Sequence, residues 1–248
     1  MRDFKGYSTI TQRMSDSNSN YHSMQVYANK RKGAFTYTIS YTLAKVLTDS
    51  SGNGDNPEGY QDRHYNYGPA SFDRHHAFVT TYSYQVPYFK GSNAFTSNPV
   101  VNGVFGGWQL SGITRYQTGA PLTVTANTSI GSRRADYLGG PVLLDSPGPN
   151  GWLNPAAFAS APDTRRGNSS VGIARGPGLY LWDFSIRKNF SLAKAHEGMR
   201  LQFQADMFNA WNWANFRNPQ TNMANASWNT VSTAGPPRNI QLALKLNF

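Results

Sequence analysis

Bulky apolar residues alternate with small or polar residues over several long stretches of this chain. In segment 34–46, Phe35, Tyr37 and Ile39 occupy one parity, and Thr or Ser residues stand between them. Side chains of a β-strand point alternately to its two faces, so this pattern predicts a strand with one apolar and one polar face. Six further segments show the same alternation: 22–29, 75–86, 107–117, 180–190, 199–210 and 238–248.

The length of these segments and the placement of their charges indicate a membrane barrel. Most run to about eleven residues, more than the 5 to 6 typical of soluble strands and close to the 9 to 11 that cross an outer-membrane-type bilayer. A Lys or Arg facing lipid at mid-bilayer costs about 2 to 4 kcal/mol, so charges should avoid the lipid face except near strand ends. On the apolar parity, charges occur only at strand ends: Lys45, Arg74, Lys188 and Arg238. The other parity, predicted to face the lumen, carries Arg115, Asp183, Arg187, Arg200, Asp206 and Lys245.

The connections between the predicted strands alternate in length. Three are short or medium and three are long, in the order 30–33, 47–74, 87–106, 118–179, 191–198 and 211–237. Bacterial barrels have short periplasmic turns and long external loops, so the C-terminus should lie at the periplasmic rim. The predicted fold class is all-β, an antiparallel up-and-down transmembrane β-barrel segment of about seven long strands, forming a partial barrel with long external loops.

Several side chains have an expected structural role. Asp183, Arg187 and Asp206 share the lumen-facing parity of neighbouring strands, which predicts cross-strand ion pairs. The stretch Gly103 to Gly107 is interpreted as the flexible end of a periplasmic turn. Aromatic residues of the 118–179 loop are expected to pack that loop onto itself: Tyr137, Trp152 and Phe158. A second aromatic group near strand ends is expected at the lipid headgroups: Trp108, Tyr116, Tyr180, Trp182, Trp211 and Trp213.

Composition and motifs exclude several kinds of chemistry. The chain has 248 residues and Cys 0, so disulfides and thiolate sites are excluded. A net charge of +10 suggests nucleic acid, but the basic clusters are short, scattered and outside any binding motif, so no nucleic-acid partner is expected. Adjacent His75 and His76 should point to opposite faces of a strand, and no metal or other cofactor is expected. No catalytic motif appears, so the chain is not predicted to be an enzyme.

The first fifteen residues contain no apolar segment of the kind found in a secretory signal, which favours either a cytoplasmic protein or a chain whose true beginning is missing. No apolar run approaches the roughly 18 residues of a membrane-spanning helix, which excludes a helical membrane protein.

Seven segments, in this order, resemble the C-terminal barrel of TonB-dependent outer-membrane transporters, in the Oar-like branch that bears a carboxypeptidase regulatory domain. They are residues 20–45, 73–87, 106–124, 152–162, 175–190, 201–219 and 237–248. The resemblance implies a cell outer membrane of the Gram-negative type, with residues 20–248 as the C-terminal part of the barrel and 1–19 as an N-terminal loop or truncated strand. It also implies uptake of large or scarce solutes through a barrel of about 22 strands that encloses a plug.

The resemblance assigns partners as well. The terminal aromatic and the apolar residues that alternate before it are read by the barrel assembly machinery, and here these are Leu242, Leu244, Leu246 and Phe248. Outer-membrane lipid and lipopolysaccharide are expected around the wall. The TonB complex is expected to act only through a plug, which nothing in this chain resembles.

Two other functions fit parts of the pattern. A small, passive porin-like barrel would need an even number of strands and pairing of the first strand with the last. A soluble β-sandwich that binds carbohydrate would need the aromatic faces to pack against one another in a dry core.

Overall fold

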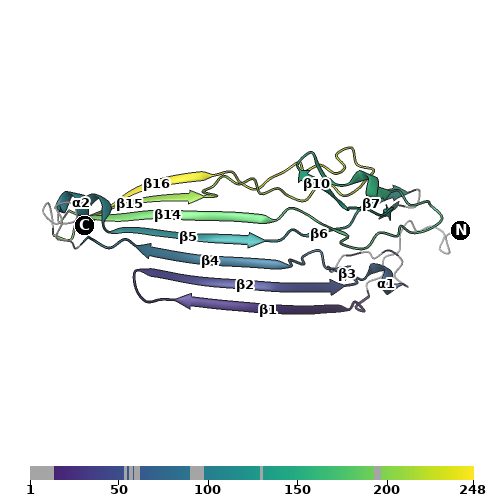
Figure 1. Ribbon diagram of the computed structural model, residues 1–248, viewed down its shortest axis with the longest axis horizontal. Helices are drawn as coiled ribbons and strands as arrows, with labels where there is room; N and C mark the ends of the chain where they lie inside the picture. Colours follow the sequence, from purple (N-terminus) through teal and green to yellow (C-terminus); the bar gives the residue numbers. More distant parts are fainter. Residues whose placement is uncertain are drawn as a thin grey trace, which may run out of the picture.

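The main feature of the fold is one antiparallel sheet of long strands (Figure 1). The computed structural model describes residues 14–52, 55, 58, 62–89, 98–128, 131–192 and 197–248. The strand order is β1-β2-β4-β5-β14-β15-β16, with the short β3 (Gly68–Pro69) paired to β2. The long strands are β1 Ser19–Lys30, β2 Phe35–Thr48, β4 His76–Gln85, β5 Trp108–Gln117, β14 Leu179–Ser191, β15 Arg200–Phe208 and β16 Asn239–Asn247. All seven predicted strands are confirmed, each boundary within three residues of its predicted position.

The register keeps one parity on one face across the whole sheet. In one row of paired residues, Tyr41 lies opposite Phe78, Phe78 opposite Tyr116, and Tyr116 opposite Tyr180. Near the other end, Ile186 of β14 lies opposite Leu110 of β5. Because side chains alternate with period two, these registers join the apolar parities of all seven strands into a single surface.

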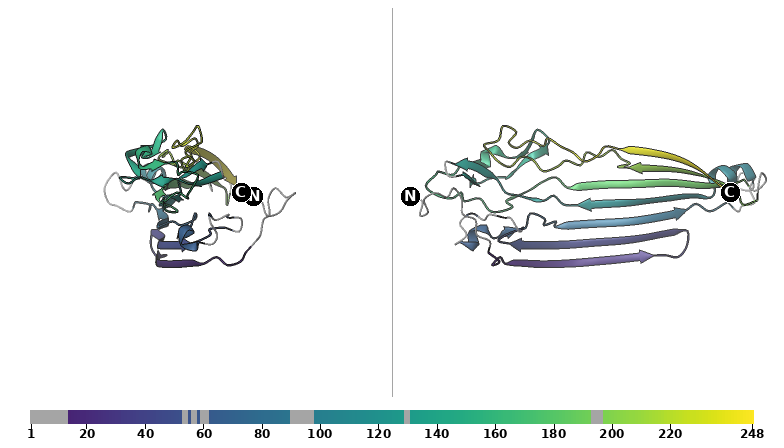
Figure 2. Two further views of the ribbon diagram at one scale, coloured as in Figure 1. Left: turned by 90° about the vertical axis from the view of Figure 1, so that its right-hand side faces the viewer. Right: turned by 180° about the vertical axis from the view of Figure 1, so that it is seen from behind.

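The sheet is an open arc. Viewed along the strands, it curves from β1 to β16, which lie at its two ends (Figure 2). In the described residues neither edge strand pairs with the other. Every neighbouring pair of long strands is antiparallel, so β1 and β16 run in the same direction. A small closed pore would need an even number of wall strands and first-to-last pairing. The described sheet has seven long strands, an odd number, and β1 does not pair with β16.

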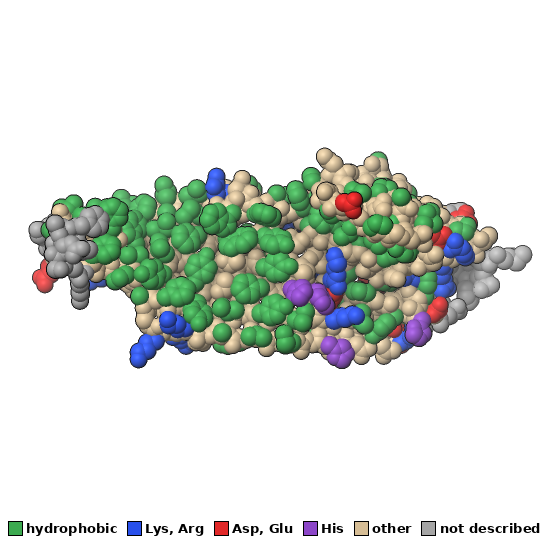
Figure 3. Space-filling model, viewed as in Figure 1, with side chains coloured by type: hydrophobic (Ala, Val, Ile, Leu, Met, Phe, Trp, Pro, Cys, Tyr) green, Lys and Arg blue, Asp and Glu red, His purple; other side chains and the backbone are tan. Residues whose placement is uncertain are grey.

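The apolar face stays exposed along the sheet. Figure 3 shows it as a broad field of hydrophobic side chains, which lies on the convex side of the arc. Phe35 is 42% exposed, Tyr84 38% and Leu242 71%. No described part of the chain seals this face, so the aromatic faces do not form the dry core that a soluble sandwich requires.

The long connections gather at one end of the sheet and the short ones, with the C-terminus, at the other (Figure 1). The long connections form a folded layer of short elements around a buried cluster made of Leu122, Val124, Ala135, Leu153, Ala157, Phe158 and Ala174. Its elements are α1 Arg63–Asn66, β6 Pro121–Leu122, β7 Thr125–Thr128, β8 Gly131–Arg134, β9 Asp136–Tyr137, β10 Leu143–Gly148, β11 Gly151–Leu153, η1 Pro155–Ala157, β12 Phe158–Ala159 and β13 Ala174–Arg175.

The aromatic residues of the 118–179 loop pack within this layer, as expected. Phe158 is 4% exposed, and Tyr137 and Trp152 pack against the same cluster. The indole Nε1 of Trp152 donates to the carbonyl oxygen of Arg175 at 2.8 Å. These rings therefore hold the loop layer together.

Aromatic rings also lie near both ends of the apolar face. Trp108 begins β5 at the end with the short turns, and Tyr116 is near the end with the long loops. The eight residue-to-residue steps from Trp108 to Tyr116 span about 26 Å along the strand, comparable to the apolar band of about 25 Å in outer-membrane barrels. At the loop end, the Tyr180 ring lies 5.0 Å from the Tyr116 ring and 5.7 Å from the Trp213 ring.

The segment from Gly103 to Gly107 differs from its prediction. Much of it belongs to a short helix, α2 (Pro99–Phe105), whose C-terminal carbonyls receive a cation from the sheet. Lys188 is 2% exposed, and its Nζ donates to the carbonyl oxygens of Gly103, Val104 and Gly106. The expectation that Lys188 extends to the interface is therefore wrong, because the unpaired carbonyls at the helix end offer its ammonium group closer partners.

Among the described residues, no helix is both long and apolar enough to cross a membrane.

The two faces can be tested with a pair of neighbouring cysteines, because the chain has no cysteine of its own. Ile39 lies on the apolar face and Ser40 on the polar face of β2. We expect a spin label at Ile39→Cys to collide mainly with oxygen, which concentrates in hydrocarbon. A label at Ser40→Cys should collide mainly with a water-soluble nickel complex. The measurement is electron paramagnetic resonance of the protein in membranes, and equal accessibilities at the two sites would contradict the two-face arrangement.

Candidate functional site

The polar face of the sheet carries all six charges that were predicted to face a lumen. Arg115 lies opposite Leu181 of β14, and Ser185 of the same strand lies opposite Asp206 of β15. Gln202 of β15 then lies opposite Lys245 of β16. These registers place the six side chains on one face: Arg115, Asp183, Arg187, Arg200, Asp206 and Lys245. That this face lines a lumen stays a prediction.

The contacts on this face are only partly those expected. Asp183 pairs with Arg115, at 3.5 Å between Oδ2 and Nη2, rather than with Arg187. Asp206 accepts from the Ser185 hydroxyl at 2.6 Å and from Gln204 at 2.7 Å. The Nε of Arg187 is buried and, in the described part of the chain, has no hydrogen-bond partner. Among the described residues, the polar face thus holds one cross-strand ion pair, and the Asp206 carboxylate accepts from a hydroxyl and an amide.

A cavity of about 630 Å³ lies where the polar face meets the long loops. The sheet contributes Gln117, Leu181, Asp183 and Phe208, which share the polar parity of their strands. The last long connection contributes amide, guanidinium and proline groups: Asn215, Arg217, Asn218, Pro236 and Pro237. The cavity therefore offers hydrogen-bond donors, acceptors and apolar surface to a polar solute at the mouth of the wall.

Asn209 shapes the loop that covers this cavity. It follows β15, is 2% exposed and has a φ of 48°, a left-handed conformation that Asn tolerates better than most residues. Its side-chain amide donates to the carbonyl oxygens of Trp213 and Pro236, and its oxygen accepts from the Trp213 N–H. The Asn209 N–H donates to Asp183 at 3.0 Å, so the same residue links the turn to the cavity wall.

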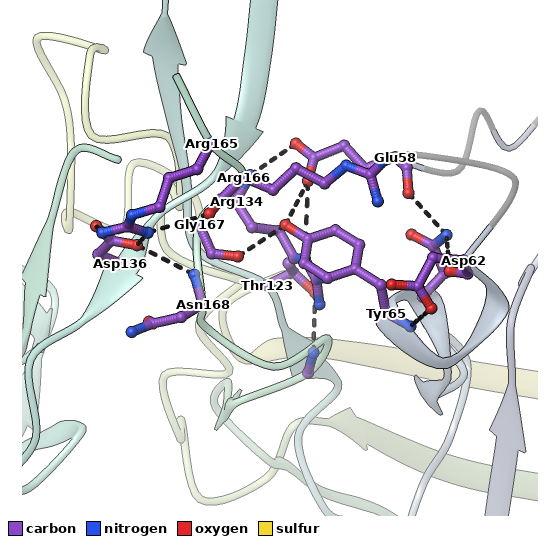
Figure 4. A network of polar contacts seen from close by, with 12 residues as sticks. Glu58, Asp62, Tyr65, Thr123, Arg134, Asp136, Arg165, Arg166, Gly167 and Asn168 are labelled. Atoms are coloured by element: carbon purple, nitrogen blue, oxygen red, sulfur yellow. Dashed lines mark hydrogen bonds and ion pairs between the residues drawn. The ribbon is translucent and has the colours of Figure 1, made fainter. Parts of the chain in front are cut away.

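A polar network joins the first long connection to the second (Figure 4). The Cζ atom of Arg134 lies 3.4 Å from the centre of the Tyr65 ring, and the Arg134 N–H donates to Glu58 Oε1 at 3.0 Å. The Tyr65 hydroxyl lies 2.7 Å from Glu58 Oε2 and 2.8 Å from the Gly167 carbonyl oxygen. Burial, together with the Glu58 carboxylate, raises the pKa of Tyr65, so the hydroxyl keeps its proton for these contacts.

Asp136 anchors the other side of this network (Figure 4). Its carboxylate accepts two hydrogen bonds from Arg165, at 2.7 and 2.6 Å, and one from the Asn168 N–H at 3.1 Å. The Arg165 hydrogen bonds hold the pKa of the Asp136 carboxyl below its usual value, although burial opposes them. This paired geometry fixes β9 against the segment that precedes β13.

The ion pair of Asp73 and Arg175 is a central link that sequence reasoning missed. Asp73 is fully buried; its Oδ1 accepts from the Val46 N–H at 2.8 Å and its Oδ2 from Arg175 Nη2 at 2.6 Å. The pair ties the ends of β2 and β4 to the loop layer. The two residues lie 102 positions apart. The sequence feature that the two residues share is their position, since Asp73 begins segment 73–87 of the family resemblance and Arg175 begins segment 175–190.

The two adjacent histidines differ from their prediction. The rings of His75 and His76 lie 4.9 Å apart, edge to face, and both line one hollow on the apolar face. His75 precedes the first residue of β4, so the alternation of a strand does not apply to it. In the described residues no group of three or more potential ligands is placed to hold a metal ion.

Long antiparallel strands, an exposed apolar face and an opposite charged face define the wall of a transmembrane β-barrel. The chain belongs to the outer membrane beta barrel domain family, whose model matches residues 1–241. Its location is accordingly the outer membrane, and domains of this kind are typically non-enzymatic. No curated protein and no solved structure matches the chain.

The Asp136 ion pair predicts an acid-sensitive loop layer. Because the folded-state pKa of Asp136 lies below its unfolded value of about 3.9, its stabilising effect is complete above that pH and is lost as the pH falls through the folded pKa. A cysteine at the buried position Ala157 reports this through its rate of modification by a disulfide reagent that reacts in acid. We expect protection at pH 7 and a loss of protection below about pH 4.

Two variants in the Ala157→Cys background provide the comparison. Asp136→Asn should weaken protection at neutral pH and flatten the pH profile, because the amide cannot form the charged pair with Arg165. Asp145→Asn removes an exposed acid of the same loop and should leave the profile unchanged. Identical profiles for the two variants would contradict the role of Asp136.

Proposed function

We propose that the chain forms the C-terminal part of the barrel wall of a TonB-dependent outer-membrane transporter of the Oar-like branch, which takes up large or scarce solutes. In this proposal residues 20–248 are wall and external loops, and residues 1–19 are an N-terminal loop or truncated strand. The observation that carries it is the open sheet, since both β1 and β16 have an unpaired edge in the described residues. A bilayer does not tolerate such edges, so further strands must cover them.

Strand direction constrains how the wall can close. Because β1 and β16 run in the same direction, joining them directly would create a parallel pair in an otherwise antiparallel wall. An odd number of additional strands restores antiparallel pairing at both edges. Barrel diameter grows with strand number, and 22-stranded barrels are wide enough to contain a plug. A wide barrel of this kind suits a large solute, with the TonB complex acting through the plug.

In this proposal, the solute passes along the cavity where the polar face meets the long loops and then along the polar face itself. The cavity combines the Asp183 carboxylate with Arg217 and with amide groups from the loop. Below it, the charged residues of the polar face continue along β14 and β15. We propose that these lumen-facing groups contact the solute or the plug during passage.

The last strand supports a proposal about assembly. Leu242, Leu244 and Leu246 are exposed at 71%, 66% and 49%, and Phe248 at 94%. All four share one parity at the edge of the sheet, where β16 has a partner only on the β15 side. An apolar row on a free strand edge can be bound by another strand, so we propose that the barrel assembly machinery recognises these residues.

The size of the native protein tests the transporter proposal. We expect the polypeptide in isolated outer membranes to be several times heavier than 27.5 kDa and to co-purify with TonB. The measurement is immunoblotting of outer membranes with an antibody against this chain, followed by affinity purification. A heat-modifiable band at the mass of this chain that conducts ions passively would overturn the proposal in favour of a small pore.

Deletion of Phe248 in the full-length parent tests the assembly proposal. We expect less folded protein in the outer membrane, because the terminal ring would be missing from the recognised row. Phe248→Tyr keeps an aromatic ring and should assemble normally. The measurement is surface labelling together with heat modifiability, and unchanged surface assembly of the deletion variant would contradict the role of Phe248.

A further inference from the structure

A hollow of about 590 Å³ opens on the apolar face, at the end of the sheet that carries the long loops. Figure 3 shows histidines and basic side chains gathered where the hydrophobic field meets the loop layer. Four long strands contribute to the hollow through Lys45, His76, Tyr116 and Tyr180. The loop layer and the chain before β4 add Pro69, His75, Thr118, Gly119, Arg175 and Gly178.

The charged groups of the hollow are basic. No Asp or Glu is among its described lining residues, which include Lys45 and Arg175. The nearby carboxylate of Asp73 is fully buried and already bonded to Arg175 and to the Val46 N–H. Lys45 is exposed, and its ammonium group has no partner in the described part of the chain. The hollow therefore has an unmatched positive charge that suits an anion.

Hydrogen bonding leaves a further donor in the hollow. The Tyr41 hydroxyl lies 2.8 Å from Nδ1 of His76. In the tautomer in which Nδ1 accepts from this hydroxyl, the ring proton is on Nε2, which is then the donor open to another partner. His75 packs edge to face against the same ring. On the opposite side, the rings of Tyr116 and Tyr180 form an aromatic wall. The donors and the wall together can hold a polar head group that is larger than a single phosphate.

The position of the hollow identifies the kind of ligand. It lies beside the row in which Tyr41 faces Phe78 and Phe78 faces Tyr116, on the same apolar face that runs down the sheet. A ligand seated here would place its anionic head among Lys45, His75 and His76 while its apolar part lay along the exposed side chains below. An anionic lipid has this combination of groups, whereas a soluble anion would leave the apolar surface uncovered.

We propose that this hollow binds the phosphate-bearing head group of lipopolysaccharide, with Lys45 as the main contact to phosphate and the histidines as further donors. The assignment to this lipid rests on the outward orientation of the long loops, which belongs to the proposed function. The mass of the parent and its co-purification with TonB do not depend on Lys45, so the two proposals can fail separately.

The test measures lipid binding by the parent protein, extracted from outer membranes and washed free of lipid. The probes are lipid A with two phosphates, the same lipid A after dephosphorylation, and phosphatidylglycerol. We expect Lys45→Gln to raise the Kd for the phosphorylated lipid A about fivefold, because one basic residue near an anionic lipid surface contributes an effect of that size. His75→Gln should weaken binding as well.

The matched control is Lys245→Gln, which removes a lysine from the polar face and should leave lipid binding unchanged. Heat-modifiable mobility of each variant verifies that it is folded. An unchanged Kd for Lys45→Gln, or an equal loss in the control, overturns the site. Binding that survives dephosphorylation also overturns it, because the acyl chains alone would then account for the affinity. Tighter binding of phosphatidylglycerol overturns the choice of lipid.

Discussion

The pairing of backbone N–H and C=O groups between neighbouring strands is the constraint on which the rest of the structure depends. Hydrocarbon offers no hydrogen-bond partner, so each segment that crosses it must satisfy its polar backbone against another strand. The ladders from β1 to β16 follow one another without interruption. Side chains alternate with period two, so the pairing that satisfies the backbone also separates an apolar face from a polar one. Charge segregation follows from this arrangement, and the open edges of β1 and β16 are the places where the described pairing is incomplete.

A sheet whose apolar face stays exposed cannot use that face to build a core, and the close-packed interior lies in the loops instead. Leu153 and Val124 are fully buried in the second long connection, and Met223 and Trp228 pack on the same cluster from the third. Asn229 joins these connections: its side chain accepts from the N–H groups of two residues of β11 and donates to the Leu153 carbonyl oxygen. Burial away from water therefore stabilises the loop layer, whereas contact with lipid suits the exposed face of the sheet.

The strands could be predicted from the sequence because their signal is local. Alternation within about ten residues is enough to place β2 or β16, and it also assigns Arg115 or Lys245 to the polar face. The loop layer has no such period, since its buried residues come from short segments that turn often. The prediction that Lys188 extends to the interface was wrong because its carbonyl partners lie more than 80 residues away along the chain. The Asp73–Arg175 ion pair could not be predicted because its two residues are 102 positions apart. Long-range contacts of this kind become visible only when the strand order is known.

Two lysines at opposite ends of the apolar face differ in whether their ammonium groups are hydrogen-bonded within the chain. Lys188, near the short turns, is buried beneath α2 and bonded to three backbone carbonyl oxygens, so its charge is satisfied within the chain. Lys45, near the long loops, stands exposed beside two histidines and has no such partner among the described residues. An ammonium group that is satisfied internally keeps a turn in place. The exposed ammonium group of Lys45 keeps its charge free for an anionic partner outside the chain. On this reasoning Lys188 stabilises a turn at one end of the apolar face, and Lys45 is suited to bind an anion at the other end.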